Sequence, residues 1–135
     1  MGFASGVNAW RRFLKPGGVM AVSEITWTSA DRPRELDQHW CAQYPEIDVA
    51  SNKIATMEAA GFRVLGYFVL PESCWTHNYY APMEDRFEDF LVRHQSSDAS
   101  KAIVAAERAE IAMYQRYKSY YGYGMYIAQR IEDER

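Results

Sequence analysis

The feature that most constrains this chain is a proline–glycine turn that leads into a strand with apolar residues on both faces. The turn is Lys15-Pro16-Gly17-Gly18, and the strand expected after it covers residues 19–26. Proline and two glycines break a helix, so the helix expected over residues 5–14 ends at the turn. A strand that is apolar on both faces is typical of a sheet covered on two sides, which favours an α/β fold.

The rest of the chain alternates helical and extended patterns around an aromatic segment, residues 72–82, which we expect to be a loop. Further helices are expected over residues 33–44, 51–60, 87–94 and 100–120. Further strands are expected over residues 62–70 and 123–131. This order predicts one α/β unit, residues 1–135, with a three-stranded sheet and flanking helices.

Bulk properties exclude several classes of protein. The 135 residues are 48% hydrophobic and 24% charged with a net charge of −3, so we expect a globular chain without a nucleic-acid or anionic-membrane surface. No apolar stretch is long enough to span a bilayer, and residues 1–5 do not resemble a signal peptide. Cys41, Cys74 and three scattered histidines fit neither a disulfide framework nor a metal site. We therefore expect a cytoplasmic protein that binds no metal.

Three motifs, in order along the chain, resemble class I S-adenosylmethionine (SAM)-dependent methyltransferases. Leu-Lys-Pro-Gly-Gly at residues 14–18 is similar to the family's turn into its fifth strand. Glu58-Ala59-Ala60-Gly61-Phe62 is similar to the helix end before the sixth strand, and Tyr123-Gly124-Met125-Tyr126-Ile127-Ala128 to the terminal strand. The resemblance covers nearly the whole chain and is closest to small-molecule methyltransferases of the ubiquinone-biosynthesis group.

The resemblance implies the C-terminal half of a Rossmann-like methyltransferase fold. Its three-stranded mixed sheet would hold the fifth, seventh and sixth strands in that order, with the last strand antiparallel. No Gly-x-Gly-x-x-Gly sequence is present, and no strand precedes the first helix, so the half that holds the cofactor is expected to be absent. Gly2 and Phe3 would lie just beyond the fourth strand as the remaining cofactor contacts. We therefore expect the chain to bind SAM weakly or not at all by itself.

Ligands of doubly wound sheets bind at the carboxyl ends of the strands, which selects two segments. At the end of the first strand, Glu24 is a candidate to bind or deprotonate a methyl acceptor, and Trp27 is a candidate wall of the acceptor pocket. The alternative is structural: backbone donors would satisfy the carboxylate, and the indole would pack on the following helix.

The second segment follows the strand over residues 62–70. Trp75, Tyr79 and Tyr80 suit an apolar or planar acceptor, with Asn78 as a polar contact. In the same stretch His77 is a candidate catalytic base. The alternative is an ordinary aromatic segment packed on a neighbouring helix.

Two functions remain open from the sequence. The first is the acceptor-binding half of a small-molecule methyltransferase. The second is a non-catalytic dimerisation or binding module built on the same half-fold, because a sheet without its fourth strand exposes the edge of the fifth. A homodimer, or pairing with the missing half, would cover that edge.

Overall fold

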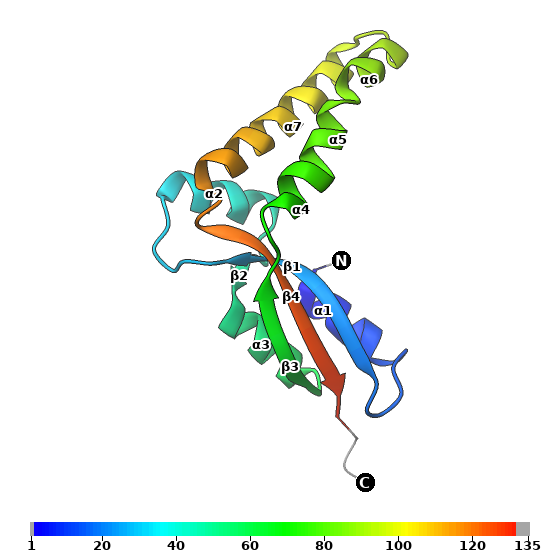
Figure 1. Ribbon diagram of the computed structural model, residues 1–135, viewed down its shortest axis with the longest axis vertical. Helices are drawn as coiled ribbons and strands as arrows, with labels where there is room; N and C mark the ends of the chain where they lie inside the picture. Colours follow the sequence, from blue (N-terminus) through cyan, green and yellow to red (C-terminus); the bar gives the residue numbers. More distant parts are fainter. Residues whose placement is uncertain (1, 132–135) are drawn as a thin grey trace. The chain divides into compact units, whose positions relative to one another are not determined.

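The computed structural model describes residues 2–131, which form two compact units (Figure 1). The sheet unit consists of residues 2–70 and 119–131, and the helical unit consists of residues 71–118. All strands of the described chain belong to the sheet unit, so the chain returns to the sheet after the helical unit. That residues 1–135 act as one partial domain stays a prediction.

The sheet of the described residues has four strands in the order β2-β1-β4-β3. β1 (Val19–Trp27) and β3 (Phe62–Val69) both pair antiparallel with β4 (Tyr121–Arg130), which lies between them. The expected mixed sheet with a central, antiparallel last strand is confirmed. The expected count of three strands is low by one, because β2 (Asp48–Val49) adds a short parallel partner at the end of β1.

Two glycines with a left-handed backbone fix the turns into the strands. Gly17 has φ 76° and donates its amide hydrogen to the carbonyl of Arg130 over 2.9 Å. Gly61 has φ 81°, follows the end of α3 (Ala50–Ala59) and donates to the carbonyl of Glu58 over 3.0 Å. Glycine adopts this conformation without the steric cost of a Cβ atom, which is why both turns were recognisable from the sequence.

One face of the sheet is covered by α1 (Phe3–Arg11) and α3, as Figure 1 shows. Residues at alternate positions of the strands point into the core between these helices and the sheet, and Met20 and Val22 of β1 pack at its border. The buried residues of this core are Phe3, Val7, Met57, Ala60, Phe62, Tyr126 and Ala128. The first helix begins two residues earlier than its expected start at Ser5, with Gly2 as its N-cap.

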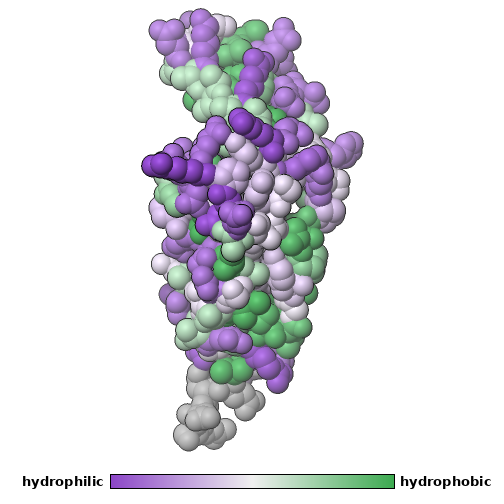
Figure 2. Space-filling model, turned by 90° about the vertical axis from the view of Figure 1, so that its left-hand side faces the viewer, coloured by the Kyte–Doolittle hydropathy of each residue, from purple (hydrophilic) through white to green (hydrophobic). Residues whose placement is uncertain are grey.

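The opposite face of the sheet carries apolar side chains that are open to solvent. Val19 of β1 is 52% exposed, and Leu65 and Phe68 of β3 are 51% and 49% exposed. In the lower half of Figure 2, green apolar residues interrupt the polar surface of the sheet unit. The described residues therefore bury one face of the sheet and leave the other partly uncovered, whereas the sequence predicted a sheet covered on two sides.

The edge of β1 away from β4 is also open. β2 pairs only with Thr26 and Trp27, so residues 19–25 have no strand partner on that side within the described chain. An apolar groove of about 440 Å³ lies at this strand. Its lining residues are Trp10, Phe13, Leu14, Val19, Met20, Ala21 and Val22.

The helical unit is an antiparallel pair of helical segments (Figure 1). Its elements are α4 (Ser73–Trp75), the π-helix η1 (Thr76–Tyr80), α5 (Ala81–Glu84), α6 (Phe87–Arg93) and α7 (Asp98–Tyr117). The expected loop over residues 72–82 is wrong, because residues 73–84 run as almost continuous helix. Pro82 stands in the first turn of α5, directly after the π-helix, where it leaves one amide hydrogen out of the helical hydrogen-bond ladder.

The close approach of three strands at Gly124 supplies a test of the sheet. A Cβ atom at Gly124 would lie 2.5 Å from the Tyr67 ring and 3.0 Å from the Thr26 hydroxyl, whereas a Cβ at Gly66 would meet nothing within 4 Å. We expect Gly124→Ala to lower the free energy of unfolding by about 1–3 kcal/mol through overpacking. Gly66→Ala, the matched control, should change it by less than about 0.5 kcal/mol. Urea unfolding followed by circular dichroism measures both, and equal effects would contradict this register.

Candidate functional site

The carboxylate of Glu24, near the end of β1, is held by two donors at one oxygen. Its Oε1 accepts a hydrogen bond from the Tyr44 hydroxyl over 2.7 Å and an ion-paired hydrogen bond from Lys53 Nζ over 2.7 Å. The Lys53 side chain is only 4% exposed and that of Glu24 is 13% exposed, so the pair is largely removed from water. A carboxylate paired in this way joins β1 to α3 and to the end of α2 (Arg34–Gln43).

The environment of Lys53 stabilises its positive charge from several sides. Its ammonium group lies 4.7 Å from the centre of the Phe3 ring and 5.6 Å from that of Tyr44, and it also donates to the Glu46 carbonyl. Burial, and then the hydrogen bond to Glu24, raise the pKa of Tyr44 well above its ordinary value, so the phenol stays a donor. Glu24 therefore holds a structural network together through Oε1.

The start of α1 lies beside this network. The Phe3 amide donates to the Tyr44 hydroxyl over 3.2 Å, and the Ala4 amide donates to Glu46 Oε2 over 3.1 Å. The Glu46 carboxylate fills the space that a Cβ at Gly2 would need. A helix N-terminus can bind an anionic group, but here the protein's own side chains take the amides of Phe3 and Ala4. Gly2 and Phe3 as cofactor contacts stay a prediction.

Trp27 lies in an aromatic cluster of the sheet unit. It is 5% exposed, its ring meets that of Tyr121 edge-on at 6.1 Å, and the Arg32 guanidinium lies 4.4 Å from its centre. Trp40 of α2 contacts the same tyrosine at 5.3 Å. These contacts join Trp27 to β4 and to the segment before α2, and both its role as a pocket wall and its expected packing on the following helix stay predictions.

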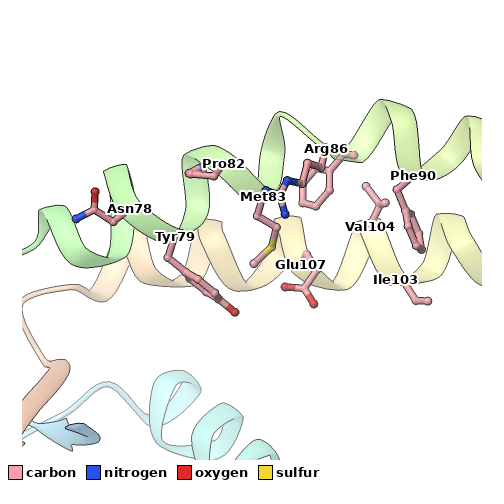
Figure 3. Close-up of a pocket in the computed structure, with 10 residues that line it drawn as sticks. Asn78, Tyr79, Pro82, Met83, Arg86, Phe90, Ile103, Val104 and Glu107 are labelled. Carbon is pink, nitrogen blue, oxygen red and sulfur yellow. The ribbon is translucent and has the colours of Figure 1, made fainter.

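The helical unit contains a pocket of about 500 Å³ between α7 and the helices that precede it (Figure 3). Two of the residues expected to contact an acceptor, Asn78 and Tyr79, line it. The other residues that line the pocket are Pro82, Met83, Arg86, Phe87, Phe90, Ile103, Val104 and Glu107. A mostly apolar concave surface with a few polar groups is the usual character of a small-molecule site.

The remaining residues of the expected acceptor segment lie outside this lining. Trp75 is 2% exposed and stacks on Tyr114 with ring centres 4.7 Å apart. Tyr80 is 1% exposed and donates from its hydroxyl to Glu110 Oε1 over 3.1 Å. The two rings join α4 and η1, respectively, to α7. His77 is exposed, and its role as a base stays a prediction.

Sequence reasoning did not identify the half of the pocket that α7 supplies. Ile103 and Val104 fit the helical period of a core stripe, and Glu107 fits a solvated face. The period shows which residues of α7 share a face, but only the packing of α5 and α6 against it shows that this face lines a cavity. The same end of the pocket is acidic. Burial first, and then the negative charges of Glu110 and Glu107, raise the pKa of Tyr79.

Other kinds of site receive no support from the described residues. Among residues 2–131, no group of three His, Cys, Asp or Glu side chains is arranged to hold a metal ion. In the same part of the chain no helix has both the length and the apolar character needed to cross a membrane. Cys41 and Cys74 are free thiols.

No protein-family model and no curated protein sequence matches this chain. Solved structures do match it. A SAM-dependent methyltransferase from Geobacter sulfurreducens, in complex with S-adenosyl-L-homocysteine, superposes on 93% of this chain and 51% of its own, with 18% identity and a TM-score of 0.71. The corresponding values for a SAM-dependent methyltransferase from Thiobacillus denitrificans with the same ligand are 95%, 52%, 16% and 0.71.

The cyclase SpnF superposes on 96% of this chain and 44% of its own, with 24% identity and a TM-score of 0.62. The chain thus spans about half the length of these structures. The order of its strands, with β4 antiparallel between β1 and β3, is the arrangement that the three sequence motifs predict. The chain has the α/β fold of the C-terminal half of a class I SAM-dependent methyltransferase.

Proposed function

We propose that this chain is the acceptor-side part of a cytoplasmic, SAM-dependent methyltransferase that acts on a small molecule. The observation that carries the proposal is the likeness in fold to methyltransferases solved with S-adenosyl-L-homocysteine. The pocket of the helical unit supports it, because Asn78 and Tyr79 line that pocket and belong to the segment expected to contact an acceptor.

The chemistry of methyl transfer makes a modest demand on the acceptor side. Bound SAM supplies an electrophilic methyl group, and the protein aligns the acceptor in line with it and excludes water. The apolar walls of the pocket would exclude water, and Tyr79 and Asn78 would orient the acceptor. The exposed His77 would accept a proton only if the acceptor has one to lose.

Glu24 has a different part in this proposal. Because its Oε1 accepts from both Tyr44 and Lys53, the carboxylate positions the start of α1 and α3. If Glu24 contacts an acceptor, it would do so through its second carboxylate oxygen, Oε2. The first role rests on the two hydrogen bonds to Oε1, and the second on the strand-end rule alone.

Weak or absent SAM binding by the isolated chain follows from the state of the α1 amides. The amides of Phe3 and Ala4 are engaged, and the sequence has no Gly-x-Gly-x-x-Gly turn. We therefore expect the Kd for SAM and for S-adenosyl-L-homocysteine to exceed about 1 mM, so that titration with either ligand gives no saturating heat signal. Isothermal titration calorimetry makes the measurement. The matched methyltransferase from Geobacter sulfurreducens is the positive control, and micromolar binding by this chain would refute the expectation.

Binding of an acceptor-like molecule tests the function itself. In a fragment screen by protein-observed NMR, aromatic or apolar fragments should shift the signals of Asn78, Met83 and Val104. Tyr79→Ala should weaken that binding by about tenfold, because it removes a half-exposed ring from the pocket wall. Val92→Ala, a control at an exposed position of α6 outside the pocket, should not. Fragments that shift only residues of the sheet unit would count against the proposal.

The open edge of β1 favours a second candidate, a dimerisation or binding module. Residues 19–25 lack a strand partner on one side within the described chain, and the groove at this strand is lined by apolar residues. An unpaired apolar edge pairs readily with another chain. A second copy of this chain, or the other half of a methyltransferase fold, would cover it.

Two exposed apolar residues give a matched test of this candidate. Phe13, in the groove, and Val92, on α6, are each 72% exposed. Phe13→Glu should weaken a homodimer about 30-fold, which corresponds to roughly 2 kcal/mol for one buried aromatic side chain. Val92→Glu should leave the dimer intact. Light scattering across a concentration series reads both, and a wild-type chain that stays monomeric well above micromolar concentration would exclude the homodimer.

A further inference from the structure

The pocket of the helical unit has apolar walls on both sides. Met83, Phe87 and Phe90 come from α5 and α6, and Ile103 and Val104 come from α7. Phe87 and Val104 are buried, with 7% and 4% exposure, so apolar side chains form the deepest part of the lining. Such walls bind the apolar or aromatic body of a ligand through area removed from water.

The acidic groups of the pocket come from α7. Figure 3 shows the Tyr79 hydroxyl and the Glu107 carboxylate projecting to the same side of the pair of helices. Glu110 lies one helical turn further along α7, where the hydrogen bond from Tyr80 holds its carboxylate. Burial is the main cause of the raised pKa of the Tyr79 hydroxyl, and the negative charges of the Glu110 and Glu107 carboxylates raise that pKa further.

Two basic groups lie at or near the pocket. Arg86 comes from the turn before α6 and is exposed, and it forms no ion pair with Glu107 in the described part of the chain. The Arg108 guanidinium lies 5.5 Å from the centre of the Phe87 ring. Glu107 is half-buried, so its charge is screened less by water than that of the exposed Arg86.

We propose that this pocket takes an amphiphilic amine, a small molecule with an apolar or aromatic body and one protonated amino group that faces Glu107 and the Tyr79 hydroxyl. The inference rests on the proposed function and narrows it, since it names the chemical class of the acceptor. An ammonium group is a donor of three hydrogen bonds and carries the charge that two nearby carboxylates favour. Because Arg86 also lines the pocket, the alternative ligand is an anion, and the test must distinguish it from an amine.

Three probes that share one aromatic body and differ in charge separate these possibilities. Phenethylamine, phenethyl alcohol and phenylpropanoate are titrated into the full chain at neutral pH, and binding is followed by the NMR signals of pocket residues Met83 and Val104. We expect the amine to bind most tightly and the carboxylate most weakly. Raising the salt from about 50 to 500 mM should weaken binding of the amine and leave binding of the alcohol unchanged.

Variants assign the preference to a residue. Glu107→Gln should lower the affinity for the amine about three- to fivefold, the range of a partly solvated ion pair, without changing that for the alcohol. Glu88→Gln is the matched control, because Glu88 is an exposed acidic residue of α6 that does not line the pocket. Circular dichroism verifies that each variant folds, and the salt dependence of the wild type tests the charge effect without any variant.

The outcomes separate the two proposals. Tightest binding of the carboxylate, lost in Arg86→Gln, would overturn the amine class and leave the acceptor pocket standing. Equal binding of the amine and the alcohol, with no effect of salt or of Glu107→Gln, would do the same. Absence of any pocket shift with all three probes would overturn this inference together with the acceptor role of the pocket.

Discussion

The buried ion pair between Lys53 and Glu24 is the interaction on which the sheet unit depends. Lys53 reaches Glu24 from the first turn of α3, and Tyr44 reaches the same oxygen from the end of α2. Through the Tyr44 hydroxyl the network also fixes the first amide of α1. Removing one member would leave a charge away from water without its partner, which costs several kilocalories per mole where the pair is buried. One residue of β1 thus sets the positions of three helices.

This constraint decides what the strand end is able to do. A carboxylate at the carboxyl end of a strand has the pattern of a catalytic group, and Glu24 has that position. In the structure, Oε1 of Glu24 accepts hydrogen bonds from Tyr44 and Lys53. The nearby amides of Phe3 and Ala4 donate to Tyr44 and Glu46. The polar groups at the start of α1 therefore satisfy one another, whereas the pocket of the helical unit keeps charged groups that face a cavity.

Local chemistry explains which parts of the structure were predictable. Gly17 and Gly61 stand where a left-handed backbone is needed, and the apolar residues of β1 predict a strand, so turns and strands were recognisable. The expected cover on both faces of that strand was not found within the described chain, because Val19 on its second face is open to solvent. Residues 73–84 were not recognisable as helix, because their aromatic side chains and Pro82 are typical of a loop in isolation. Their helical state depends on contacts distant in sequence, such as the stacking of Trp75 on Tyr114. The pocket escaped prediction for the same reason, since it requires two helices to face each other.

The apolar edge of β1 is common to both proposed functions. The superposed methyltransferase structures are about twice as long as the part that this chain matches, so a complete fold of this kind has further surface to place against the sheet. Within the described residues, Phe13 and Val19 are exposed at the groove along that edge. An acceptor-side part needs the cofactor-binding half of such a fold, and a binding module needs a second copy. Either partner would remove the same apolar groove from water, and burial of that apolar surface would stabilise the complex.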